Sequence, residues 1–256
     1  DINALFNSPV LGYNSKDDIV YQFWANRDSH EVYYFDPKTD YAPTTAISSI
    51  SWDDPNFPNI EGFGVWAAKC NFTMGPDGKM YSRMLGGNLV RIDVENARGE
   101  NLTNGDLVGT KDGSAYGLVF DPQDENVFYF SNNDKHCIYK YDLRTKECAC
   151  WAGQEGKSGY LDGPIGQAMF NKPGQMCVDS EGNIILTDTE NHCIRKITMS
   201  TGYVSTLAGK PQNSGYVNGS AEDAQFKKPL GICIDNDDVM YIGDSENRAI
   251  RRLAVE

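Results

Sequence analysis

Hydrophobic residues in the C-terminal half of the chain recur in short runs, each ended by Gly, Asn, Asp or Ser. From residue 174 to residue 209 the runs read GQMCVD, IILTD, HCIRKIT and YVSTLAG, separated by SEGN, TEN and a turn at STG. Short runs rich in β-branched and aromatic residues between such turns predict antiparallel strands joined by hairpins. We expect about four strands here and no helix, because no helical periodicity is present.

The same pattern returns after 56 residues, so that Phe226 repeats Phe170 and Asp244 repeats Asp188. A fixed period of this length indicates stacked supersecondary units. Three earlier copies are traceable, and the approximate repeat units are 2–45, 67–108, 115–153, 170–209 and 226–256. The sequence therefore predicts one all-β domain over residues 1–256, a β-propeller of four-stranded antiparallel blades with five repeat units visible.

The last repeat unit contains three predicted strands, and no spare strand is evident near residue 1. Two interpretations remain open. The array has five blades with imperfect closure, or a blade lies upstream of this chain. We favour the second.

The net charge of the chain limits the classes of molecule that it is expected to bind. The formal net charge is −13, from 36 acidic and 23 basic residues. Binding to nucleic acid or to anionic lipid requires clustered Lys and Arg, so we expect neither. No run of eighteen apolar residues occurs, and hence we expect no transmembrane segment.

Seven cysteines are present, and none forms a CxxC motif. Cys137 and Cys193 share one repeat position, and Cys177 and Cys233 share another. Symmetry-related cysteines within predicted strands are best interpreted as small buried apolar residues, with disulfides as the alternative.

The segment TDTENHCIRKI, preceded by FNKPGQMCVD and followed by VSTLAG, resembles the NHL repeat; Asn191 and His192 match its first two letters. The linking segment GQEGKSGYLDGPIGQAMF resembles NHL propellers attached to IPT/TIG modules in exported proteins of gut bacteria. The resemblance implies six blades, a preceding β-sandwich module, and a location at the cell surface or in the periplasm, with lipid anchoring through a preceding region as one option. It implies no single activity, because a propeller hosts many.

The three histidines, His30, His136 and His192, occupy one repeat position. Three His can bind zinc, as they do in an NHL-type peptide-amidating lyase. Residues set by the repeat are instead spread around the ring of blades, which favours a hydrogen bond across each loop. We therefore predict no metal, no cofactor and no catalytic residue.

A second set of residues lies four positions before the histidines, at the end of each second strand. This strand-end ring is expected to face the central funnel on the side of the blade-linking loops, and it contains Asn26, Arg83, Asn132, Asp188 and Asp244. The alternative for Asp188 and Asp244 is that they cap the TEN and SEN turns. Asn26 and Arg83 are the better ligand candidates because the repeat does not dictate them.

Aromatic residues are concentrated in the linkers on the same side. The irregular linker SWDDPNFPNIEGFGVW contains Trp52, Phe57, Phe63 and Trp66, and the later linkers contain Tyr116, Tyr160 and Tyr216. Aromatic faces beside Asp and Asn side chains are typical of carbohydrate binding. The alternative for Tyr160 and Tyr216 is that they fix their loops to the scaffold, and for Trp52 and Phe57 that they pack their own loop.

These observations lead to a non-catalytic propeller that binds a ligand, with a glycan as the leading candidate. Two other classes stay open. One is a metal-dependent lyase or lactonase that uses the central funnel, and the other is a protein-interaction scaffold.

Overall fold

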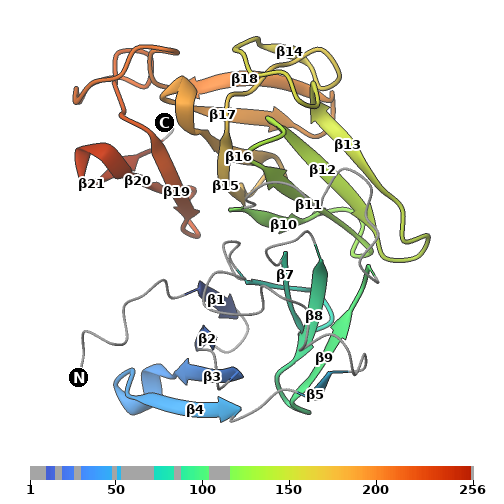
Figure 1. Cartoon of the computed structure of the whole chain (residues 1–256). Helices are drawn as coiled ribbons and strands as arrows, with labels where there is room; N and C mark the ends of the chain where they lie inside the picture. Colours follow the sequence, from blue (N-terminus) through green and yellow to red (C-terminus); the bar gives the residue numbers. More distant parts are fainter. Residues whose placement is uncertain are drawn as a thin grey trace. The chain divides into compact units, whose positions relative to one another are not determined.

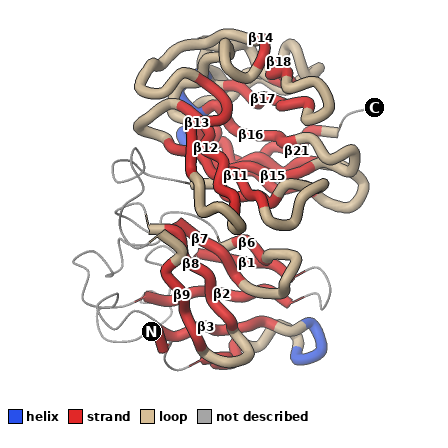
Figure 2. Tube along the Cα trace, turned by 90° about the vertical axis from the view of Figure 1, so that its right-hand side faces the viewer, coloured by secondary structure: helices blue, strands red, loops and turns tan. Residues whose placement is uncertain are grey.

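The fold was analysed in a computed structural model, which describes residues 10–14, 19–25, 30–47, 51–52, 72–83, 88–103 and 116–254. The chain divides into two compact units, residues 1–112 and residues 113–256, and each is described by itself. The described residues form strands, turns and short 3-10 helices (Figures 1 and 2). The predicted all-β class is confirmed.

The first unit contains two sheets. One is antiparallel and follows chain order, with β1 (Val10–Asn14), β2 (Ile19–Ala25), β3 (His30–Phe35) and β4 (Pro43–Ile47). The other has the order β5-β9-β8-β7-β6, built from β5 (Ser51–Trp52), β6 (Thr73–Met74), β7 (Met80–Arg83), β8 (Leu89–Asp93) and β9 (Arg98–Asn101). Its strands are antiparallel except β5, which pairs in parallel with β9 at the edge.

The second unit contains three sheets. The first comprises β10 (Leu118–Phe120), β11 (Val127–Asn132), β12 (Cys137–Asp142) and β13 (Cys148–Gly153). The next has the order β14-β18-β17-β16-β15, from β14 (Gly163–Pro164), β15 (Pro173–Val178), β16 (Ile184–Asp188), β17 (Cys193–Thr198) and β18 (Tyr203–Ala208). The last has three strands, β19 (Pro229–Ile234), β20 (Met240–Asp244) and β21 (Ala249–Leu253).

Successive side chains of each strand point to opposite faces of its sheet. Strand β16 is buried along its whole length, since its sheet is covered on both faces. Ile184 and Leu186 point to one side and Ile185 to the other, into two separate clusters. This explains why three consecutive apolar residues, Ile184, Ile185 and Leu186, begin this strand.

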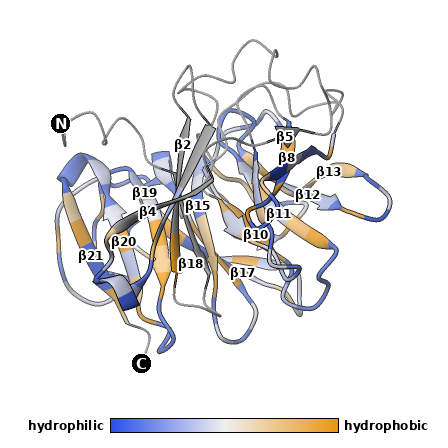
Figure 3. Ribbon diagram, turned by 90° about the horizontal axis from the view of Figure 1, so that it is seen from below, coloured by the Kyte–Doolittle hydropathy of each residue, from blue (hydrophilic) through white to orange (hydrophobic). Residues whose placement is uncertain are grey.

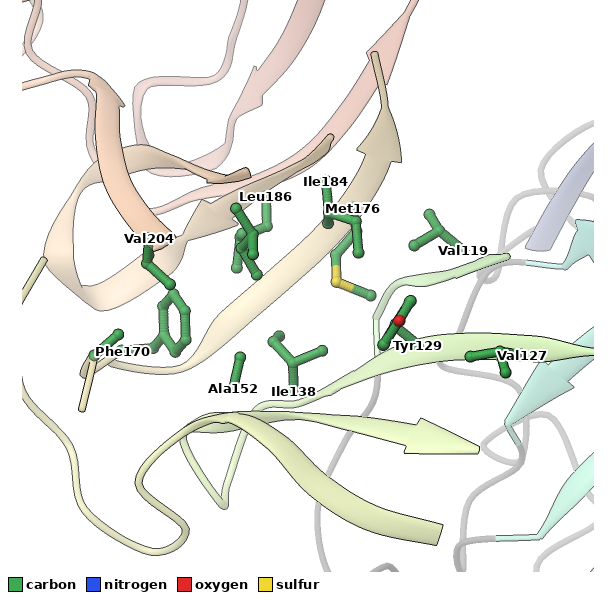
Figure 4. Close-up of a cluster of buried hydrophobic side chains, with 12 residues drawn as sticks. Val119, Val127, Tyr129, Ile138, Ala152, Phe170, Met176, Ile184, Leu186 and Val204 are labelled. Carbon is green, nitrogen blue, oxygen red and sulfur yellow. The ribbon is translucent and has the colours of Figure 1, made fainter. Parts of the chain in front are cut away.

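The first cluster joins the sheets β10–β13 and β14–β18. Figure 4 shows Ile138 and Ala152 from the first sheet opposite Met176, Leu186 and Val204 from the second. The second cluster joins β14–β18 to β19–β21 through residues that include Ile194, Phe226 and Ile242. Hydrophobic residues are concentrated in the strands and hydrophilic residues in the turns (Figure 3). The buried side chains therefore link neighbouring blades of this unit.

The cysteine interpretation holds in part. Cys137 and Cys193 are fully buried, whereas Cys177 is half-buried and Cys233 is exposed. No disulfide joins the cysteines of the described residues. Cys233 departs from the prediction because it lies in the final three-stranded sheet, where described residues cover it less than its counterparts.

None of the helices in the described part of the chain is long and apolar enough to cross a membrane.

Candidate functional site

The strand-end ring is placed where the sequence predicts. Arg83, Asn132, Asp188 and Asp244 are the last residues of β7, β11, β16 and β20, while Asn26 lies outside the described residues. The four described side chains are buried, however, with at most 2% of any residue exposed. A polar group this deeply buried needs partners within the protein.

Asp188 finds its partners within its own sheet and in the preceding linker. Its carboxylate accepts hydrogen bonds from the Asn171 backbone N–H at 2.8 Å, from Asn191 Nδ2 at 2.9 Å and from an Arg195 guanidinium nitrogen at 2.7 Å. The final blade repeats this arrangement with Asp244, which accepts from Lys227, Asn247 and Arg251. Neither carboxylate caps its 3-10 turn through a backbone N–H, so the predicted capping role is corrected to these bonds.

The Arg195 guanidinium completes the network. It lies 4.8 Å from the centre of the Tyr160 ring and 5.2 Å from that of Phe170, and none of its side chain is exposed. Burial raises the pKa of Asp188 to about 6, and the positive charge of Arg195 opposes this rise. A buried ion pair of this kind is held by multiple bonds on both partners, and losing one partner leaves an uncompensated charge.

Asp188 and Asp244 therefore hold their own sheet to the preceding linker through buried hydrogen bonds. Ligand binding by the strand-end ring stays a prediction. The signal for the buried bonds was present in the sequence, because Arg195 and Arg251 recur at the same spacing as Asp188 and Asp244. A charge pair repeated inside apolar strands is expected to be internal.

The histidines connect consecutive blades. His136 Nδ1 accepts a hydrogen bond from the Lys172 backbone N–H at 3.1 Å, and His192 Nδ1 accepts one from Lys228 at 3.2 Å. Both histidines adopt left-handed backbone conformations, with φ of 56° and 60°. A repeated hydrogen bond is therefore present, but it reaches the residue immediately before the first strand of the next blade. The side chain of His30 lies outside the described set.

The linker tyrosines differ in their hydrogen bonds and in their exposure to solvent. The Tyr160 hydroxyl lies 2.7 Å from Thr206 Oγ1, and its ring covers Arg195, so Tyr160 fixes its linker to the scaffold. Tyr216 covers Arg251 in the same way but is 60% exposed. Tyr116 is half-buried, and its backbone N–H donates to Ser131 Oγ.

Little of the irregular aromatic linker falls within the described residues. Trp52 ends the short strand β5, whose backbone pairs with Gly99 of β9 at the sheet edge. Its side chain, and the whole of Phe57, Phe63 and Trp66, lie outside the described set. Ligand binding by these residues stays a prediction.

A feature that the sequence analysis missed is a rim of paired charges beside the buried network. Lys228 Nζ lies 3.3 Å from a Glu190 carboxylate oxygen and 3.1 Å from one of Glu246, and Lys227 Nζ lies 3.4 Å from Glu246. These residues, the charged rim, are Glu190, Lys227, Lys228 and Glu246. Their signal was the recurrence of Lys before Pro and of Glu in TEN and SEN.

A separate cleft of about 220 Å³ lies at the opposite end of the strands, near the hairpin turns after β15 and β19. It is lined by Asp179, Glu181, Ile185, Lys196, Leu207, Asp238 and Met240. Its carboxylates are engaged, since Asp179 and Glu181 pair with Lys196 and Asp238 accepts from Ser180. Among the described residues, no group of three His, Cys, Asp or Glu is arranged to hold a metal ion.

Comparison with known proteins supports the repeat assignment. Residues 170–197 match the NHL repeat model. The chain is 25% identical over 98% of its length to SUPPRESSOR OF QUENCHING 1 of Arabidopsis thaliana, covering 25% of that protein. It is 30% identical over 59% of its length to NHL repeat-containing protein 2 of Gallus gallus, covering 19% of it. The chain thus spans about a quarter or less of these relatives.

Solved structures share the fold. A Bacteroides thetaiotaomicron protein of unknown function aligns over 96% of this chain and 58% of its own, with a TM-score of 0.81 and 24% identity. An auxiliary nutrient binding protein of the same species gives 0.65 and 24%, covering 96% and 68% of the two chains. Virginiamycin B lyase of Staphylococcus aureus gives 0.54 and 15%, covering 97% and 71%. The chain therefore contains a match to the NHL repeat at residues 170–197 and has the β-propeller fold that these neighbours share.

Proposed function

We propose that this propeller is a binding module that recognises a glycan through the irregular linker between its first two blades. The observation that carries the proposal is the departure of residues 52–66 from the repeat, with Trp52, Phe57, Phe63 and Trp66 in fifteen residues. The repeated polar residues of the second unit are used to hold its blades. Ligand recognition is thus left to segments that the repeat does not dictate.

Two further observations agree with a glycan. Tryptophan and phenylalanine offer flat apolar faces that stack on the C–H faces of sugar rings. The fold is shared with two proteins described as auxiliary nutrient binding proteins, from Bacteroides thetaiotaomicron and Bacteroides ovatus. The net charge of −13 disfavours strongly anionic polysaccharides, so we infer a neutral glycan.

The test is affinity electrophoresis in gels that contain neutral plant or host polysaccharides. The protein is expected to be retarded by at least one, and Trp52→Ala combined with Trp66→Ala is expected to abolish retardation. Tyr41→Ala is the matched control, because Tyr41 is an exposed aromatic residue elsewhere in the first unit. Retardation that persists in the double variant would contradict the proposal, as would a lack of retardation in every gel.

The metal-dependent enzyme is the weaker candidate. Its imidazole ligands would include His136 and His192, whose Nδ1 atoms already accept backbone hydrogen bonds in separate blades. Stoichiometric zinc or calcium in the purified protein, measured by elemental analysis, would favour the enzyme over the binding module.

We also infer that the chain belongs to an exported protein that carries an IPT/TIG module. The support is the linker resemblance and the Bacteroides neighbours. Fractionation of cells that express the complete reading frame tests this inference, since recovery only in the cytoplasm would contradict it.

A further inference from the structure

The cleft near the hairpin turns has an apolar floor between the sheets β14–β18 and β19–β21. The floor is formed by Ile185 of β16, Leu207 of β18 and Met240 of β20. These residues belong to the cluster that joins the two sheets, or pack against it. The repeat places an equivalent space one blade earlier, between the sheets β10–β13 and β14–β18. The side chains of the two spaces can therefore be compared position by position.

An aromatic pair fills the earlier space. Tyr129 is the counterpart of Ile185, because each lies opposite a lysine of the third strand of its sheet. Trp151 is the counterpart of Leu207, because each is the extra residue where the register of the outer strand shifts. The centres of the Trp151 and Tyr129 rings lie 4.2 Å apart, and Tyr129 belongs to the cluster in Figure 4. The later space has two aliphatic side chains in place of these two rings, and there the cleft is open.

The size of the cleft limits its occupant to one small ring system. A cavity of about 150 Å³ is enough to hold a benzene molecule. The cleft measures about 220 Å³, which suits a two-ring group such as the indole that Trp151 contributes one blade earlier. Pockets for larger organic ligands are about 300–1,000 Å³. Burial of a flat apolar ring against the aliphatic floor is favourable, because it removes apolar surface of both from water.

The rim of the cleft is acidic. Asp179, Glu181 and Asp238 contribute three carboxylates, and Lys196 contributes one ammonium group. Lys196 Nζ lies 2.9 Å from an Asp179 oxygen and 3.4 Å from one of Glu181. One lysine balances one of three carboxylates, so the rim has a formal excess of two negative charges. Such a rim attracts a cationic group and disfavours an anionic one.

We propose that this cleft binds a small aromatic amine. Its flat ring lies on the floor of Ile185, Leu207 and Met240, where it takes the place that Trp151 fills in the preceding pair of sheets. Its ammonium group lies at the rim and donates to the carboxylates of Glu181 and Asp238, which can accept further hydrogen bonds. The site lies wholly within the second unit and does not depend on glycan recognition by residues 52–66.

The probe for the direct test is tryptamine, which combines an indole ring with a primary ammonium group. Calorimetric titration measures its affinity, and the amide chemical shifts of isotope-labelled protein locate its site. We expect saturable binding, with the largest shifts in residues 179–185, 205–208 and 238–240. Indole-3-propionate has the same ring with a carboxylate, and we expect it to bind at least tenfold more weakly. Ethylamine, which has no ring, should not bind.

Three results of this titration would overturn the proposal. One is a lack of saturable tryptamine binding at millimolar concentration. Another is equal affinity for the two indoles, because the acidic rim would then have no role. The third is a set of largest shifts that lies outside the named residues, because the ligand would then occupy a different site.

A substitution taken from the preceding blade tests the site itself. Leu207→Trp introduces the residue that fills the earlier space, and we expect it to abolish tryptamine binding without lowering the melting temperature. Tyr203→Trp is the matched control, because Tyr203 lies on the same strand, is 46% exposed and does not line the cleft. It should leave the affinity for tryptamine unchanged. Tryptamine binding that persists in a folded Leu207→Trp protein would overturn the proposal.

A second variant keeps the test decisive if Leu207→Trp does not fold. Glu181→Gln removes one charge of the rim from a side chain that is 74% exposed, and it leaves the apolar floor intact. We expect at least threefold weaker binding of tryptamine and no weakening of indole-3-propionate. An equal effect on both indoles, or no effect on either, would contradict the assigned position of the ammonium group.

Discussion

His192 and Lys228 are joined by a hydrogen bond from the Lys228 backbone N–H to His192 Nδ1, across the junction between two blades. His136 and Lys172 form the same bond one repeat earlier. An acceptor role requires a neutral imidazole, since the protonated ring carries only donors. The link that His136 forms between blades therefore requires its neutral imidazole.

Acidification should weaken the link at His136. Burial lowers the pKa of His136, Lys172 lowers it further, and Asp134 raises it. The unfolded histidine titrates near 6.5, so the unfolded state takes up a proton before the folded state does. This contribution to stability is present above about pH 6.5 and is lost as the pH falls through the lower folded pKa.

The measurement is the melting temperature of the wild type and of His136→Asn between pH 8 and pH 5. Asn tolerates the left-handed backbone conformation and does not titrate. We expect the difference in melting temperature between the wild type and His136→Asn to shrink as the pH falls. If the melting temperatures of the two proteins changed equally with pH, protonation of His136 would not contribute to the loss of stability.

Removing one partner of the buried ion pair should be costly. Asp188→Asn removes the buried counter-charge of Arg195 and leaves it only the partly exposed Asp162 carboxylate, and we expect a loss of about 3 kcal/mol in the free energy of unfolding. Urea denaturation measures this loss. Adding Arg195→Met to the same protein should recover part of it, because the uncompensated charge is then absent.

Glu246→Gln is the control for the ion pair. It breaks the contacts of Glu246 with Lys227 and Lys228 on the exposed charged rim, where solvent screens the charges. We expect no measurable change in the unfolding midpoint. If the Asp188 and Glu246 variants were equally stable, the buried network would not have the role assigned to it.

Substitution of Gly209 should lower the stability of the protein. Its φ is 98°, and a Cβ there would lie 3.0 Å from the His192 carbonyl oxygen. We expect Gly209→Ala to destabilise the protein by about 1–3 kcal/mol in thermal or urea denaturation. Gly166→Ala is the matched control, because nothing lies within 4 Å of the added carbon and φ is not positive. A neutral Gly209→Ala would contradict the predicted strain.

The two linker tyrosines should respond differently to loss of the hydroxyl. Tyr160→Phe removes the contact with Thr206, and we expect it to cost about 1 kcal/mol. Tyr216→Phe should be neutral in the isolated chain, because its hydroxyl has no partner among the described residues. Differential scanning fluorimetry of both variants tests this contrast, and equal shifts would count against it.

The period of 56 residues indicates the runs that form strands in the sheets β14–β18 and β19–β21. Runs such as HCIRKIT predict strands of a layered sheet. The final repeat is predicted to have three strands, and its sheet has three. Asp188 was harder to assign, because a carboxylate at the end of a strand caps a turn, binds a ligand or pairs with a buried cation. Its spacing from Arg195 distinguishes these roles only once β16 and β17 are known to be adjacent.

The bond from Lys228 to His192 was not predictable in detail. It depends on the left-handed backbone at both residues, with φ of 49° and 60°, which non-glycine residues rarely adopt. The exposure of Cys233 was missed for a different reason. Repeat symmetry assigns equal burial to equivalent positions, but within the second unit the sheet β14–β18 packs against two described sheets and β19–β21 against one.

The sheets β14–β18 and β19–β21 are fastened at both ends of their strands. Asp238 accepts from Ser180 at the hairpin turns, and Thr189 donates to the Pro229 carbonyl beside the His192 link at the other end. A protease that cuts the exposed connection around residues 212–220 would therefore sever the backbone without releasing the last sheet. The nicked protein should elute as one species under native conditions and separate into two fragments only in denaturant.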